Sequence, residues 1–175
     1  MEKLDFHEIE SKIQKFWEEN KIYSTNLKSK EIYSIDTPPP NISGKMHIGH
    51  SFMYSQMDFI ARFMRMKIGS VFYPFGTDDN GLPTERLVEK AKKIKSIKMS
   101  RADFVKVCLN FLKDYTPEAI KDWKDLGISC DYNLAYSTID PQAQRVSQKS
   151  FLDLYKKGYV YKKNFPTIWC PHCQT

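Results

Sequence analysis

The sequence lacks any apolar run of about 18 residues, the length that a membrane-spanning helix needs. Its first residues, MEKLDFHEIESKIQ, mix charged and apolar positions and lack the apolar middle of a secretion signal. Cysteine is scarce, and the isolated Cys108 and Cys130 suit a reducing compartment better than a disulfide framework. These absences predict a cytoplasmic protein that does not associate with membranes.

Internal repeats and low-complexity segments are absent as well. With 41% apolar and 27% charged residues, the 175-residue chain can bury one sizeable core. Much of the net charge of +6 lies in two lysine-rich segments, EKAKKIKSIK and YKKGYVYKKN. Such segments either contact the phosphates of a nucleic acid or form solvated surfaces, and the sequence leaves both readings open.

Helix and strand patterns alternate along the first half of the chain. Asp5 and Glu8 have the spacing of a capping box, so we expect a helix over 6–20 whose apolar stripe lies in the core. A strand over 31–36, a helix over 46–67 that ends at Gly69, and a strand over 70–75 then form one parallel strand, helix, strand unit.

The second half is predicted to be mainly helical. Helices are expected to begin at Pro83, at Ser100, at Pro117 and, behind an Asp140 cap, at Pro141. The third of these ends at Gly127 and the last at Gly158. Short strands are expected in the tail, residues 159–175.

The segment TPPPNISGKMHIGH, residues 37–50, joins the first strand to the next helix. In parallel α/β units the ligand site lies at this edge, where the helix offers free N–H groups. The segment is poor in glycine for a phosphate loop, with Gly44 and Gly49 alone. His47 and His50 share one helix face and could both donate hydrogen bonds to a phosphate, while Gly49 leaves room for the nucleotide. A zinc-protease motif would need a different spacing and a nearby glutamate.

A second loop, FGTDDNGLPTERLVEK at 75–90, follows the second strand and therefore reaches the same edge. A carboxylate at Asp78 could bind an ammonium group there. Alternatively Asp78, Asp79 and Asn80 only form the turn into Gly81, and both readings can hold together.

The segment WCPHC contains a Cys-x-x-Cys turn at Cys170 and Cys173, which is typical of one half of a zinc ribbon. Two further ligands are required, so the sequence predicts an incomplete Zn²⁺ site. A redox role is disfavoured because no thioredoxin-like pattern surrounds the pair.

The tetrapeptide HIGH, His47 to His50, resembles the first signature of class I aminoacyl-tRNA synthetases. The longer PPPNISGKMHIGH and the Gly-Thr-Asp loop resemble the forms found in valyl-tRNA synthetases of archaeal type. KMSRADF, 98–104, is similar to the second signature, Lys-Met-Ser-Lys-Ser, but Arg101 replaces its last lysine, and we interpret Ser100 as a helix cap.

The resemblance implies the first half of a Rossmann-like nucleotide-binding domain, with a parallel sheet and flanking helices, over residues 1–158. Residues 159–175 would then begin the connective editing insertion with its incomplete zinc knuckle. It further implies a monomeric ligase that activates valine with ATP and Mg²⁺ and transfers it to tRNA(Val). We expect this chain, as an N-terminal fragment of such an enzyme, to be inactive alone.

The resemblance also implies roles for particular residues. His47 and His50 would be catalytic and, with Gly44 and Gly49, would bind ATP. The amino acid would be bound by Pro38, Pro39, Pro40, Asn41 and Asp78.

Three alternatives remain open from the sequence. Isoleucine competes with valine as the amino acid. A stand-alone nucleotidyltransferase would share the histidine signature, but it would not explain the cysteine pair or the Gly-Thr-Asp loop. A zinc- and RNA-binding module would bind RNA through its basic segments even without both histidines.

Overall fold

The structure is a computed structural model that describes residues 4–171. It contains two compact units, one up to Ile139 and one from Asp140 onward. The second unit contains a single helix, α5 (Pro141–Lys156), within its described part. The domain boundary expected at residue 158 stays a prediction. None of the described helices is long and apolar enough to span a membrane.

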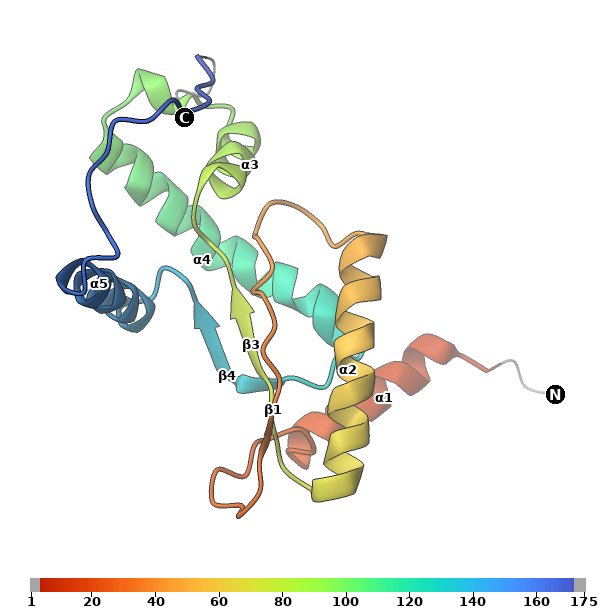
Figure 1. The fold of residues 1–175 in the computed structure, drawn as a ribbon. Coiled ribbons are helices and arrows are strands. Elements are labelled where there is room, and N and C mark those ends of the chain that lie inside the picture. Colours follow the sequence, from red (N-terminus) through yellow and green to blue (C-terminus); the bar gives the residue numbers. More distant parts are fainter. Residues whose placement is uncertain (1–3, 172–175) are drawn as a thin grey trace. The chain divides into compact units, whose positions relative to one another are not determined.

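The first unit alternates helices with short strands (Figure 1). Its helices are α1 (Phe6–Glu19), α2 (Ile48–Ile68), α3 (Leu82–Lys92), the 3-10 turn η1 (Ser96–Lys98) and α4 (Arg101–Asp125). Its strands are β1 (Tyr33–Ser34), β2 (Val71–Phe72), β3 (Pro74–Thr77) and β4 (Asp131–Ser137).

All strand pairs are parallel. β1 pairs with β2, and β3 pairs with β4, with Thr77 opposite Ser137. Beyond β1 the chain continues beside β3, because Asp78 N donates to Pro40 O at 2.8 Å and Ile42 N donates to Asp78 O at 3.1 Å. The predicted parallel unit is therefore confirmed, and its pairing brings residues 40–42 against Asp78.

The main core lies between α2, the strands and the end of α4. Tyr54 from α2, Phe75 from β3 and Trp123 from α4 are buried there and contact one another through their rings. Gly76 is required beside this core, because a Cβ atom at that position would lie 2.3 Å from the ring of Tyr136. This close packing fixes β4 against β3 at the edge where the predicted site lies.

Several predicted helix ends are confirmed. Asp5 caps α1 by accepting hydrogen bonds from the backbone N–H groups of His7 and Glu8. Ser100 caps α4, which confirms KMSRADF as a helix start. Gly69 ends α2 with a φ of 85°, a conformation that glycine adopts without strain.

The prediction of separate helices before and after Pro117 is wrong, because α4 runs through Pro117 without interruption. Phe104 and Leu112 are buried before the proline, and Ala119 and Trp123 are buried after it. Packing on both sides thus outweighs the cost of an interior proline, about 3 kcal/mol.

Two further expectations about the fold are wrong. The apolar stripe of α1 does not enter the core: Ile13 is 43% and Phe16 is 56% exposed. α1 contacts the rest of the unit instead through the half-buried Trp17, whose ring lies 5.1 Å from that of Tyr23, and through a hydrogen bond from Gln14 Nε2 to Lys124 O at 3.1 Å. The tail contains no strand up to residue 171. Finally, β4 was not predicted at all.

The contacts of Glu89 on α3 lead us to expect that the folded chain becomes less stable in acid. Its buried carboxylate accepts hydrogen bonds from Ser96 N at 2.7 Å and Ser96 Oγ at 2.8 Å, and it pairs with Arg86 at 2.6 Å. These bonds, those from Ser96 first, lower the pKa of Glu89 from 4.5 to about 2. Since the folded pKa is depressed, the contribution is present above about pH 4.5 and is lost as the pH falls towards 2.

The free energy of unfolding should therefore fall between pH 7 and pH 3 by about 2 kcal/mol more in the parent chain than in Glu89→Gln. Urea unfolding at both pH values measures this difference. An identical pH dependence in the two proteins would contradict the assignment. Glu85→Gln, on the same helix, serves as the control and should keep the parent's dependence.

Candidate active site

The turn at residues 47–50 is fixed by its own hydrogen bond. His47 is the N-cap of α2, and its Nδ1 accepts from Gly49 N at 3.1 Å. Because Nδ1 acts as an acceptor, the proton of the neutral imidazole lies on Nε2. A Cβ atom at position 49 would lie 3.1 Å from the His47 ring, so any larger residue would press on this exposed ring. The exposed His47 therefore presents an N–H donor at the helix start.

His47 and His50 lie together, as the sequence predicted. Their rings stack with centroids 3.9 Å apart and planes 21° apart. Burial, and then the neighbouring His47, lower the pKa of His50. His50 therefore favours its uncharged form, in which one ring N–H can still donate a hydrogen bond to an anion.

The proline segment leads rigidly into this turn. Pro40 is buried, and Pro38 O accepts a hydrogen bond from Tyr54 Oη at 2.7 Å. Gly44 has a φ of 154°, and no atom lies within 4 Å of a Cβ built on it. Pro39, which lies between Pro38 and Pro40 in the sequence, is half-buried. The structure thus anchors the segment to α2 through Tyr54.

Asp78 forms the second part of the site; its predicted place in the turn is confirmed, and its binding of an ammonium group stays a prediction. Its Oδ2 accepts from Asn41 Nδ2 at 2.6 Å, which links the two predicted loops directly. Its Oδ1 accepts from Asn80 N at 3.2 Å, as in an Asx turn, and from Thr138 Oγ1 at 2.9 Å. A carboxylate has about four acceptor positions, so Asp78 can also accept from a ligand ammonium.

Neither Thr138 nor Ser137 was predicted from the sequence, and Asp79 was predicted only as part of the turn. Thr138 Oγ1 donates to Asp78 and accepts from Asp79 N at 3.1 Å. Asp79 is buried and accepts from Thr77 Oγ1 at 3.0 Å and from Ser137 Oγ. The available signal was the alternation in DYNLAYS, which marks β4 and therefore a third strand end at this edge.

The predicted metal pair is only partly described. Cys170 lies in the second unit, and Cys173 lies outside the described residues. Within residues 4–171 no group of three or more histidine, cysteine, aspartate or glutamate side chains could hold a metal ion. Zinc therefore stays a prediction.

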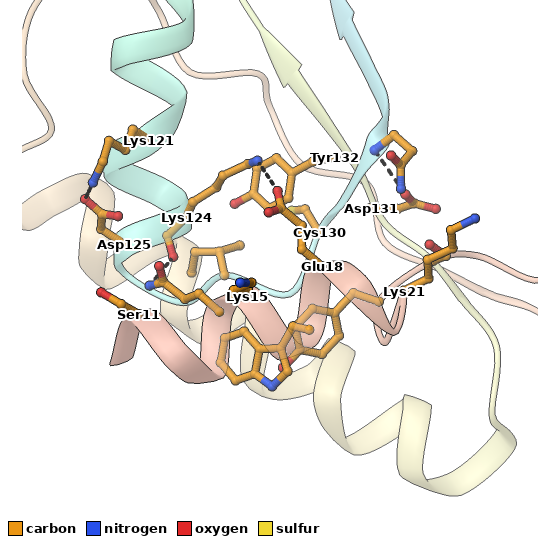
Figure 2. Close-up of a pocket in the computed structure, with 16 residues that line it drawn as sticks. Ser11, Lys15, Glu18, Lys21, Lys121, Lys124, Asp125, Cys130, Asp131 and Tyr132 are labelled. Carbon is orange, nitrogen blue, oxygen red and sulfur yellow. Dashed lines mark hydrogen bonds and ion pairs between the residues drawn. The ribbon is translucent and has the colours of Figure 1, made fainter. Parts of the chain in front are cut away.

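A separate cavity of about 600 Å³ lies between α1, the end of α4 and the start of β4 (Figure 2). Lysines and carboxylates form its rim as pairs, Lys124 with Glu18 at 3.0 Å and Lys121 with Asp125. None of the predicted site residues lines this cavity. The candidate active site is thus the edge that carries the two histidines and Asp78.

Comparison with known proteins finds a matching family and related sequences. The family model for class I tRNA synthetases (I, L, M and V) matches residues 12–175. Valine--tRNA ligase of Rickettsia prowazekii is 49% identical over 167 residues, which are 94% of this chain and 20% of that protein. Valine--tRNA ligase of Wolbachia sp. subsp. Brugia malayi is 46% identical over 170 residues, 97% of this chain and 20% of that protein.

A solved structure supports the fold. The LeuRS chain of an Agrobacterium radiobacter LeuRS-tRNA-LeuAMS ternary complex superposes with a TM-score of 0.78 and 26% identity, over 98% of this chain and 20% of that chain. The chain spans about a fifth of the length of these relatives. The match to the family model and the parallel α/β fold around the HIGH turn together place this chain in the class I tRNA synthetases.

Proposed function

We propose that this chain is the part of a valine–tRNA ligase that binds ATP and valine. The proposal is carried by one observation: Asn41 holds Asp78 at the same sheet edge as the stacked histidines. An anion site beside a carboxylate fits an aminoacyl adenylate, which has a phosphate and an ammonium group. Identities of 46–49% to valine--tRNA ligases favour valine as the amino acid.

In the first step a carboxylate oxygen of valine attacks the α-phosphorus of ATP, which is bound with Mg²⁺. A phosphorus–oxygen bond forms, and the bond to the bridging oxygen breaks as pyrophosphate leaves with the electron pair. His47 and His50 donate hydrogen bonds to phosphate oxygens as charge develops. Gly44 and Gly49 leave space for the nucleotide, and Asp78 holds the ammonium group.

In the second step a terminal ribose hydroxyl of a tRNA attacks the carbonyl carbon of valine. The ester bond forms as the bond between the carbonyl carbon and the phosphate oxygen breaks. AMP leaves with that electron pair, and the hydroxyl proton passes to the phosphate of the adenylate. The proposed partners are thus valine, ATP and tRNA(Val), with a cytoplasmic monomer as the working state. A zinc ion at Cys170 and Cys173 would need two ligands from elsewhere, because a structural zinc site has four.

The identity of the amino acid can be tested by measuring pyrophosphate exchange into ATP, catalysed by the gene product that carries this sequence. Pro38, Pro39, Pro40 and Asn41 are proposed to confine the branched side chain. Because one methylene is worth about 1–3 kcal/mol in an apolar pocket, valine should exceed isoleucine in kcat/KM by roughly tenfold to 200-fold. Faster exchange with isoleucine would make the protein an isoleucine enzyme instead.

Asp78→Asn should raise the KM for valine roughly tenfold to 150-fold, since a hydrogen bond to a charged group is worth about 1.5–3 kcal/mol. The KM for ATP should change little, because the variant keeps both histidines. Exchange kinetics at varied valine and varied ATP separate the two constants. Asp125→Asn, at the rim of the cavity in Figure 2, is the matched control. Equal effects on both KM values would contradict the role of Asp78.

A further inference from the structure

Trp123, on α4, contacts the imidazole of His50 on α2. The two ring centroids are 5.9 Å apart and the planes are tilted by 45°. Trp123 is only 2% exposed, so it does not line the surface of the site itself. With His47 at 3.9 Å, two aromatic rings therefore contact His50.

Trp123 is itself held firmly. Its ring meets Tyr54 edge-on with centroids 5.7 Å apart and meets Phe75 at 5.6 Å. Tyr54 in turn donates its hydroxyl to Pro38 O. The indole thus connects His50 to α2, to β3 and, through Tyr54, to the proline segment.

The residue before Trp123 supports the same turn from another side. Asp122 Oδ2 accepts a hydrogen bond from Met46 N at 3.3 Å, immediately before His47. The end of α4 therefore contacts both the start of the HIGH turn and its last histidine. This arrangement depends on α4 continuing past Pro117, since Asp122 and Trp123 both lie after the proline.

The chemistry of His50 makes its surroundings important. His50 Nδ1 is buried and has no hydrogen-bond partner among the residues that the structure describes. A ligand can therefore reach the ring only through Nε2. A preorganised donor stabilises a transition state because it needs no reorientation during the reaction.

We propose that Trp123 is a positioning residue for His50: its indole fixes the imidazole plane and shields the Nδ1 edge, so that Nε2 faces the phosphate of the nucleotide. The identity of the ligand rests on the proposed function. The contact between Trp123 and His50 does not depend on the proposed function, so it can be tested separately.

The first test follows the histidine side chains of the 175-residue chain by proton–nitrogen NMR during a pH titration. In Trp123→Leu the loss of shielding should raise the pKa of His50 towards about 6.5, the value of an exposed imidazole. Trp123→Phe should keep it low, because a ring remains. Trp17→Leu, which removes an indole that packs on Tyr23 of the same unit, is the matched control and should not move it.

An unchanged His50 titration in a folded Trp123→Leu protein would overturn the proposal. If Trp123→Leu does not fold, as amide dispersion would reveal, Trp123→Met carries the same test, because its flexible side chain adapts to the core but is smaller than the indole and opens the Nδ1 edge to water. For Trp123→Met we expect the same rise, and an unshifted pKa would again overturn the proposal.

The second test measures pyrophosphate exchange in the gene product that carries this sequence. Trp123→Leu should lower kcat roughly tenfold to a hundredfold, as for a misplaced catalytic group, and should leave the KM for valine unchanged. Trp123→Phe should restore most of kcat. Absence of exchange in the parent protein would refute the proposed function, whereas the NMR titration would still decide the role of Trp123.

Discussion

Replacing His50 with alanine is expected to lower the rate of valyl-adenylate formation by roughly a hundredfold to a thousandfold, the usual effect of losing one preorganised donor. His50 stacks on His47 and its Nδ1 is buried, so Nε2 is the ring nitrogen proposed to donate to the phosphate. Alanine removes that donor and also leaves His47 without its stacking partner.

The effect should fall on kcat rather than on the KM for valine, because the proposed function assigns the phosphates to the histidines and the amino acid to Asp78. Pyrophosphate exchange by the gene product measures both constants. His7→Ala makes the same change on α1, where the His7 side chain is 98% exposed, and should leave the rate unchanged. A His50→Ala rate within a factor of a few of the parent would show that the turn does not act in catalysis.

Asp58→Ala is expected to reduce the free energy of unfolding of this chain by about 3–5 kcal/mol, the cost of breaking a buried ion pair from one side. Asp58 lies in α2 and is buried. Its Oδ2 pairs with Arg62 Nε at 2.6 Å, and its Oδ1 accepts from Ser129 N at 2.7 Å and Ser129 Oγ at 2.6 Å. The carboxylate thus joins α2 to the segment that enters β4.

The other contacts of Arg62 make the loss of stability in Asp58→Ala larger than the loss expected from one ion pair. Its guanidinium also donates to Gly127 O at 2.6 Å and to Tyr23 Oη at 2.9 Å. Without Asp58 this partly buried cation would lose its counter-charge while remaining held by neutral groups.

A matched pair on α1 provides the control. Glu8 and Lys12 also form an i,i+4 ion pair at 2.6 Å, but both side chains are largely exposed. Glu8→Ala should therefore cost less than about 1 kcal/mol. Urea unfolding of the three proteins compares them directly. Equal destabilisation by Asp58→Ala and Glu8→Ala would contradict the structural role of Asp58.

The sequence predicted those parts of the site that depend on local order along the chain. A strand, a stiff loop and a helix start place His47 and His50 on one face whatever the rest of the fold does. The second predicted strand, 70–75, divides in the structure into β2 and β3, and β3 runs on to Thr77. It brings Asp78 to the same edge, because parallel strands end together. The family resemblance, now supported by the match over residues 12–175, pointed to the same residues.

The parts that could not be predicted depend on contacts between distant segments. Thr138 reaches Asp78 only because β4 pairs with β3, and Trp123 reaches His50 only because α4 continues through Pro117. A proline inside a helical pattern normally indicates a boundary, and here tertiary packing outweighs that preference. The exposure of Phe16 could not be predicted for the same reason, since an amphipathic pattern does not specify which segment covers its apolar face.

The central claim is that the histidine turn and Asp78 bind opposite ends of one valyl-adenylate. An NMR titration of the 175-residue chain with a valyl sulfamoyl adenylate tests it directly, since even weak binding perturbs chemical shifts. The account predicts that the imidazoles of His47 and His50, the Gly49 amide and the Asn41 side-chain amide shift along one saturation curve. Shifts confined to one of the two ends, or no shift at either, would contradict it.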